Sequence, residues 1–274
     1  MLKDITLGQY FSGNSILHKL DPRAKIILVL LYVVMIFIAD NLFSLMALLL
    51  TALILVAVSG ISYKIVLKSL KPIMILIVFT TIINLFFTTS DDAPLVHWGI
   101  IKIYRVGIIN AVFMIIRIVS LIIGTSVLLT YTTSPISLTD GIERLLKPLK
   151  KIRVPVHEFA MMMTIALRFI PTLLEETDKI ISAQKARGAG FDSKGLINKA
   201  KAFLPILIPL FISAFRRADE LATAMECRCY RGDEGRTRMK VLKYSAKDII
   251  AFFAGILFLA GVILLNTINT SLSI

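Results

Sequence analysis

The sequence predicts an all-α integral membrane protein with about five transmembrane helices and a cytoplasmic platform of long amphipathic helices. Hydrophobic residues make up 57% of the 274 residues, whereas soluble domains are closer to about 45–50% apolar. The mean hydropathy is +0.81, and the apolar residues are gathered in runs separated by short polar stretches. Two later stretches instead place apolar and polar residues on opposite faces of a helix, which is typical of amphipathic helices.

Five apolar segments are the expected membrane spans. They cover residues 26–39, 42–59, 72–87, 106–129 and 248–265. Asp21 and Pro22 are a typical N-cap and first helical residue ahead of the first span. The first two spans are expected to form a hairpin with its turn at Asp40-Asn41, because a continuous helix would place Asp40 in lipid at a cost of at least ~2.5 kcal/mol. Arg117 lies within the fourth span, so it must face protein or a water-filled cavity.

The basic residues are distributed asymmetrically around these spans. Segments 1–25, 60–71 and 130–247 hold 4, 3 and 21 of the Lys and Arg residues, which is 28 of the 31 in the chain. Positive charge collects on the cytoplasmic side of membrane proteins. The N-terminus and the long polar block are therefore predicted to be cytoplasmic, and the net charge of +13 needs no nucleic-acid partner. The expected regions are an N-terminal transmembrane region of four spans (1–132), a cytoplasmic region (133–244), and a C-terminal transmembrane helix and tail (245–274).

The cytoplasmic region contains two long amphipathic helices, here called the arms. The first arm is expected over residues 156–187 and the second over about 196–229. Pro171 is expected to kink the first arm. The second arm includes the apolar run 203–215, which is too short to cross a bilayer. We expect this run either to be buried against the other helices or to lie at the membrane surface.

Each arm ends in an arginine flanked by small residues. The two tips consist of Ala186, Arg187 and Gly188 and of Cys227, Arg228 and Cys229. A shift of 41 positions superposes the two tips and also places Asp178 on Asp219. A single cation near a helix C-terminus is explained by the helix dipole, worth about 0.3–1 kcal/mol. The duplication instead favours two contact sites, in which each guanidinium binds a carboxylate or helix-end carbonyls of a partner.

The sequence carries no complete catalytic, ATP-binding or metal-binding motif. His157 and Glu158 begin like a zinc-protease helix, but Met161 stands where the second histidine belongs. The glycines from 190 to 195 have a Walker-like spacing without the Lys and Ser/Thr that must follow. Cys227-x-Cys229 lacks a second pair of zinc ligands. We therefore expect no catalytic residue, no metal, no bound cofactor and no ATP hydrolysis by the chain alone.

Two clusters of side chains each allow two interpretations. Met161-Met162-Met163 is either adaptable packing or a surface that repacks against several partners. The second cluster consists of Lys147, Lys150, Lys151 and Arg153. It is either a patch for anionic lipid headgroups or simply a loop that follows the positive-inside rule.

Six short motifs are spread over nearly the whole chain. They are Asp21-Pro22-Arg23, Leu145-Leu146-x-Pro148-Leu149, Pro155, Leu167-Arg168-Phe169-Ile170-Pro171, Gln184-x-Ala186-Arg187-Gly188 and Ala224-Met225-Glu226-x-Arg228-x-Tyr230. In this order they resemble the transmembrane T component (EcfT/CbiQ-like) of energy-coupling-factor (ECF) transporters, a branch of ATP-driven importers. The paired Ala-Arg-Gly-type tips are the specific part. The second tip departs from that pattern by using Cys227 and Cys229, which are both small.

The resemblance implies the scaffold or energy-coupling subunit of a vitamin or transition-metal importer in the cell membrane of a prokaryote. Its partners would be the lipid bilayer, two ABC-type ATPase subunits that bind ATP and Mg, and a small membrane substrate-binding S component. Arg187 and Arg228 would each dock on one ATPase. Contacts with the S component are expected at Met162, Met163, Leu207, Phe211 and Phe215.

The alternative from another class is an integral membrane enzyme acting on lipid or isoprenoid substrates. Such an enzyme needs carboxylate or histidine clusters near the membrane interface, and the sequence shows none. A channel or carrier working alone would need polar residues lining several spans, and these spans are nearly bare of them.

Overall fold

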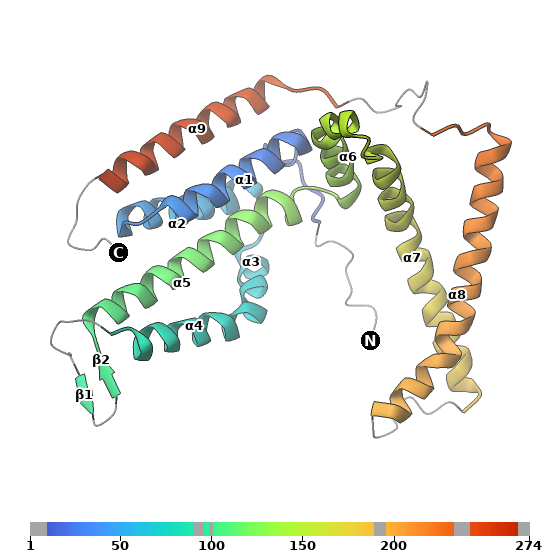
Figure 1. Cartoon of the computed structure of the whole chain (residues 1–274), viewed down its shortest axis with the longest axis horizontal. Coiled ribbons are helices and arrows are strands. Elements are labelled where there is room, and N and C mark those ends of the chain that lie inside the picture. The colour runs from blue at the N-terminus through green and yellow to red at the C-terminus, as the bar shows by residue number, and fades with distance from the viewer. Residues whose placement is uncertain (1–9, 90–95, 99–100, 189–195, 233–241, 268–274) are drawn as a thin grey trace. The chain divides into compact units, whose positions relative to one another are not determined.

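The computed structural model describes residues 10–89, 96–98, 101–188, 196–232 and 242–267, and these are almost entirely helical (Figure 1). The predicted all-α class is confirmed. Between the third and fourth expected spans, β1 (Val96–Trp98) and β2 (Ile101–Ile103) form a short antiparallel hairpin. The Walker-like glycines and residues 268–274 of the polar tail lie outside the described residues.

The chain divides into two compact units. Among the described residues, the membrane unit holds those within 8–144 and 241–274, and the arm unit holds those within 145–240. The helices that begin in the membrane unit are α1 (Pro22–Ile38), α2 (Leu42–Ser59), α3 (Tyr63–Leu70), α4 (Met74–Phe87), α5 (Arg105–Thr125), α6 (Pro135–Leu146) and α9 (Ala246–Thr267). Those of the arm unit are α7 (Val156–Ala186) and α8 (Leu196–Cys227).

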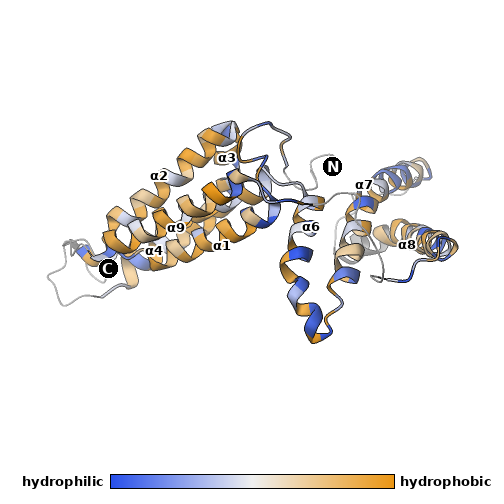
Figure 2. Ribbon diagram, turned by 90° about the horizontal axis from the view of Figure 1, so that it is seen from above, coloured by the Kyte–Doolittle hydropathy of each residue, from blue (hydrophilic) through white to orange (hydrophobic). Residues whose placement is uncertain are grey.

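Four helical segments are long and apolar enough to cross a membrane. They are Leu42–Ser59, Tyr63–Phe87, Arg105–Tyr131 and Ala246–Thr267. The helices α1, α2, α4 and α9 are predominantly hydrophobic in Figure 2. The helix α1 has 17 residues, at the lower end of the roughly 17–25 that a span needs, so a fifth span stays a prediction. The expected hairpin turn at Asp40-Asn41 is confirmed, because α1 ends at Ile38 and α2 begins at Leu42.

The segment between the second and third expected spans is helical, where a loop was expected. It forms α3 and continues through a short 3₁₀ turn, Lys71–Ile73, into α4. The physical reason is an apolar face, since Val66 is buried in the core of the membrane unit while Lys64 and Lys68 remain exposed. Burial of the apolar face therefore favours a helix, while Lys64 and Lys68 stay on its exposed face.

Tyr32 of α1 connects three helices in the middle of the membrane unit. Its hydroxyl lies 3.2 Å from the carbonyl of Leu48 in α2 and 3.1 Å from that of Ser120 in α5. Gly124 of α5 makes room for the ring, because a Cβ at this position would overlap it. The small residue is therefore required by close packing rather than by backbone conformation.

A buried carboxylate joins the starts of α1 and α9. Asp248 is 1% exposed and accepts hydrogen bonds from the backbone N–H of Asp21 (2.8 Å) and of Ser245 (2.7 Å). The Asp21 side chain caps α1 and pairs with the guanidinium of Arg23, with Nη2 and Oδ2 2.9 Å apart. Burial raises the pKa of the Asp21 carboxyl. The hydrogen bonds and charge of Arg23 and the charge of Arg144 lower this pKa by more than burial raises it, so the pKa lies below its usual value. Asp21 thus stabilises the fold as a carboxylate, and this contribution is lost as the pH falls through its folded-state pKa.

Lys25 extends this polar cluster to the end of α5. Its side chain is 1% exposed, and Nζ donates to the carbonyl of Thr132 (2.7 Å) and to the hydroxyl of Thr133 (3.1 Å). Both threonines follow the π-helical segment Ser126–Tyr131 that continues α5. The cluster therefore fixes the point from which the chain leaves the last of the first four spans.

Arg117 contacts protein, as the sequence predicts. Its Nη2 donates to the carbonyl of Ala39, the C-cap of α1, over 2.7 Å. The side chain of Asn266 donates to the neighbouring carbonyl of Ile38. Carbonyls at a helix C-terminus lack intrahelical partners, and here α5 and α9 supply donors to them.

Replacement of Gly124 by alanine is expected to destabilise the membrane unit by about 1–3 kcal/mol, because the added methyl group forces the Tyr32 ring out of its packed position. The midpoint of thermal unfolding in detergent, followed by circular dichroism, measures the effect. Gly261→Ala is the matched control, since a Cβ there has no atom within 4 Å. An unchanged midpoint for Gly124→Ala would contradict the close packing.

Replacement of Asp248 by alanine is expected to cost about 2–4 kcal/mol, because two buried backbone N–H groups lose their acceptor. The same unfolding measurement applies. Asp248→Asn keeps one acceptor oxygen and should lie between the wild type and Asp248→Ala. Equal midpoints for all three proteins would show that the carboxylate does not hold these helices together.

Candidate functional site

The two arms of the arm unit, α7 and α8, pack against each other and cross (Figure 1). Glu176 of α7 accepts hydrogen bonds from Ser213 (2.5 Å) and from the guanidinium of Arg217 (2.8 Å), both on α8. The Arg217 and Glu176 side chains are 34% and 24% exposed, so the pair is only partly screened by water. We call Glu176, Ser213 and Arg217 the clasp.

The clasp joins equivalent points of the two arms. The 41-residue shift that superposes the tips also places Glu176 on Arg217. Glu176 lies 11 positions before Arg187, and Arg217 lies 11 positions before Arg228. At 1.5 Å per residue both distances are about 16 Å, so the arms extend equally far beyond this contact.

The first tip is a regular helix end. The helix α7 closes at Ala186, and the backbone N–H of Arg187 donates to the carbonyls of Ala183 and Gln184. Gly188 follows with a φ of +83°. This left-handed conformation favours glycine and is the usual way to end a helix.

The second tip has the same backbone without the glycine. The N–H of Arg228 donates to the carbonyl of Met225 (3.1 Å) and that of Cys229 to the carbonyl of Glu226 (2.8 Å). Cys229 has a φ of +55°, so it adopts the left-handed conformation that Gly188 adopts in the first tip. The departure seen in the sequence is therefore not a departure in geometry.

The equivalence of the arms extends back along both helices. Ser182 donates its hydroxyl to the carbonyl of Asp178 (2.7 Å), and Thr223 donates to the carbonyl of Asp219 (2.9 Å). Ser182 and Thr223 are again 41 residues apart. The last two turns of the arms thus share a side-chain contact as well as a backbone conformation.

Both tips are open to contact. Every residue of the two predicted tips is exposed, and within the part of the chain that the structure describes neither Arg187 nor Arg228 forms an ion pair. The C-termini of α7 and α8 point to opposite ends of the crossed pair (Figure 1). Two exposed guanidinium groups at opposite ends can bind two separate partners at the same time.

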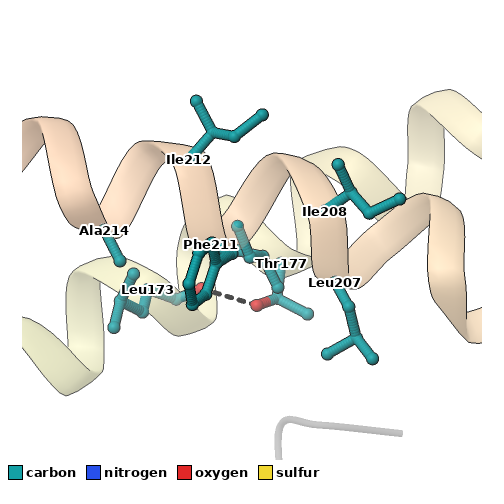
Figure 3. A pocket seen from close by; sticks show the side chains of 8 residues that line it. Leu173, Thr177, Leu207, Ile208, Phe211, Ile212 and Ala214 are labelled. Atoms are coloured by element: carbon teal, nitrogen blue, oxygen red, sulfur yellow. Dashed lines mark hydrogen bonds between the residues drawn. The ribbon is translucent and has the colours of Figure 1, made fainter.

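An open apolar groove of about 570 Å³ lies where the arms cross (Figure 3). Its lining consists of Leu173, Thr177, Leu207, Ile208, Leu210, Phe211, Ile212 and Ala214. Of the residues predicted to contact an S component, Leu207 and Phe211 line this groove, and the Phe215 ring lies 4.5 Å from that of Phe211. Met162 and Met163 are exposed on α7 but do not line it.

Within the arm unit, the apolar run 203–215 is largely exposed. Of its residues only Ile206 is buried, and the large side chains around it are more than half exposed, as for Phe211 at 65%. The run is part of the continuous helix α8, which passes through Pro205 and Pro209. Within the arm unit, α7 therefore covers only part of this run.

Sequence reasoning missed the clasp. Glu176, Ser213 and Arg217 were not singled out, although the 41-residue shift relates Glu176 to Arg217 and so contained the signal. The shift alone says that two positions are equivalent, whereas their contact depends on where the helices cross. That crossing is a tertiary property.

The fold and the exposed tips define an all-α membrane protein whose second unit is a pair of matched, crossed contact helices. The sequence profile of the family described as "Cobalt transport protein" (CbiQ) matches residues 13–240. The chain belongs to this family, whose members are membrane components of transporters.

Curated relatives agree with this assignment over almost their full length. The chain is 59% identical over 251 residues to the "Energy-coupling factor transporter transmembrane protein EcfT" of Clostridium kluyveri, covering 92% of this chain and 93% of the relative. It is 57% identical over 266 residues to the protein of the same name from Ruminiclostridium cellulolyticum, covering 97% and 98%. The Bacillus subtilis protein of that name is 45% identical over 249 residues, covering 90% and 93%.

Replacement of Cys229 by glycine is expected to strengthen the second tip, because the left-handed conformation costs a residue with a Cβ roughly 1–2 kcal/mol. Gly188→Ala should loosen the first tip by a similar amount. Hydrogen–deuterium exchange of peptides covering 183–188 and 224–230 measures both effects as slower and faster amide exchange. Cys227→Gly is the matched control, since glycine in the last helical turn is unfavourable and should speed exchange. The same direction of change for Cys227→Gly and Cys229→Gly would contradict the assigned backbone.

Proposed function

We propose that this chain is the energy-coupling subunit of an ATP-driven ECF-type importer of a vitamin or a transition metal. In this role the arms transmit conformational changes of ATPase subunits to a substrate-binding S component. The observation that carries the proposal is the pair of equivalent tips, each with an exposed arginine. The names of the relatives, which describe a transmembrane protein of an energy-coupling factor transporter, support the same role.

Each tip fits one ABC-type ATPase subunit. Arg187 and Arg228 would reach into a groove on the partner, and the small neighbours at 186, 188, 227 and 229 let the partner's backbone come close. The guanidinium group has a planar set of donors that binds carboxylates or helix-end carbonyls in pairs. ATP and Mg belong to those partners, and the chain itself would perform no catalysis.

The clasp and the groove relate the tips to the substrate-binding partner. Because Glu176 fixes α7 to α8 through two hydrogen bonds, a displacement of either tip moves the crossing as well. The exposed apolar side chains at the crossing, among them Leu207, Phe211 and Phe215, would hold the S component. Its movement in the membrane would then follow the closure and opening of the ATPases.

The proposed location is the cell membrane of a prokaryote, with the N-terminus and the arms in the cytoplasm. The distribution of Lys and Arg carries this orientation. Within the described residues no group of three or more His, Cys, Asp or Glu is placed to bind a metal ion. The alternative of a lipid-modifying membrane enzyme therefore gains no support from them.

The double variant Arg187→Glu and Arg228→Glu is expected to abolish association with the two ATPase subunits. Loss of one charged partner at an interface costs about 2–5 kcal/mol, and each single variant should reduce association in part. Co-purification of the tagged chain with both ATPases from solubilised membranes measures this.

The matched control is Lys179→Glu with Arg216→Glu, which makes the same change in charge at one exposed position on each arm. It should retain both ATPases. Undiminished co-purification of the tip variant, with thermal unfolding unchanged, would overturn the coupling role of the tips.

A further inference from the structure

A short 3₁₀ segment connects α6 to α7 and is exposed along its whole length. It covers Lys147–Ile152, and Arg153 ends it in the left-handed conformation with a φ of +62°. A 3₁₀ helix has three residues per turn, so side chains three positions apart lie directly in line. We call residues 146–153 the basic elbow.

The elbow sorts its side chains into an apolar and a basic row. Leu146, Leu149 and Ile152 recur every third residue and are 42%, 37% and 75% exposed. Lys147 and Lys150 recur in the next row, and both are exposed. Exposed leucine and isoleucine side chains beside a row of cations form one two-sided surface.

The charge of this surface is not balanced within the segment. The sequence from 145 to 155 contains Lys147, Lys150, Lys151 and Arg153 and no acidic residue. An acidic protein partner would neutralise the cations but has no need of the apolar row. An anionic lipid surface matches both, because apolar side chains enter the acyl boundary while Lys and Arg stems extend to the phosphates.

Chain connectivity keeps the elbow close to a membrane. The candidate span Arg105–Tyr131 ends sixteen residues before Lys147, and α6 has 12 of the intervening residues. Twelve helical residues extend about 18 Å. The elbow is therefore tethered within reach of the surface of the bilayer that this span crosses.

We propose that the basic elbow docks on the anionic face of the bilayer, with Leu149 and Ile152 in the acyl boundary and Lys147, Lys151 and Arg153 on lipid phosphates. The elbow would thus anchor the start of the first arm to the membrane surface. This inference does not depend on the proposed coupling function, because it concerns lipid alone and is tested without ATPases.

The test uses the full chain in nanodiscs with bromine-labelled acyl chains, which quench an indole in contact with lipid. Trp98→Phe removes the single native tryptophan, and Ile152→Trp places an indole in the apolar row. One set of nanodiscs contains phosphatidylcholine only, and the other contains equal parts of phosphatidylcholine and phosphatidylglycerol. We expect strong quenching with phosphatidylglycerol, weak quenching without it, and partial reversal by high salt.

Charge removal separates headgroup recognition from simple proximity. Lys147→Gln with Lys151→Gln should lower the ratio of docked to undocked elbow about five-fold per cation, or about 25-fold together. The matched control is Lys179→Gln with Arg216→Gln, which removes the same charge from exposed positions on the arms and should leave quenching unchanged.

Three results would overturn the proposal. The first is no quenching in either kind of nanodisc, and the second is equal quenching in both that charge removal leaves unchanged. The third is protection of the indole from aqueous iodide that arises only when the two ATPase subunits are added. That result would assign the elbow to a protein partner.

Discussion

The buried carboxylate of Asp248 is the contact on which the arrangement of the membrane unit depends. It binds backbone N–H groups at the starts of two helices, and one of these groups, on Asp21, is 227 residues away from Asp248 in sequence. Van der Waals packing alone holds apolar helices together loosely, because lipid tails are as apolar as the side chains they replace. A buried charge with two fixed donors instead specifies one register. Through Asp21 and Lys25 the same cluster reaches Thr132 and Thr133, and so determines where the chain leaves the end of α5 toward α6.

The arms place two equivalent, exposed helix ends on one chain. The backbone of each tip is stopped by a left-handed residue, and each helix places an arginine just before it. The clasp then fixes the helices to each other at equivalent positions. None of this requires catalytic chemistry. In the proposed role the chain would contribute geometry and charge, and the energy of transport would come from ATP bound by partner subunits.

Much of this organisation could be predicted from the sequence because it follows from local rules. Apolar runs indicated the spans, and the polar pair Asp40-Asn41 indicated the turn. The charge of Arg117 within a span required a protein partner, and this partner is the backbone carbonyl of Ala39. The predictions failed where tertiary packing decides. The helical α3 depends on burial of Val66, and the clasp depends on where α7 and α8 cross. The left-handed Cys229 could not be read from composition, since cysteine has no preference for that conformation.

The equal spacing from the clasp to Arg187 and Arg228 has a mechanical consequence. If the crossing acts as a fulcrum, the two arms are levers of the same length, and a force applied at either tip has the same mechanical advantage. In the proposed role, both ATPase subunits would act on this chain with the same mechanical advantage. If the proposed ATPase subunits bind the two tips, any inequality in the work that they deliver would have to originate in the ATPases, because the two arms extend equally far from the clasp.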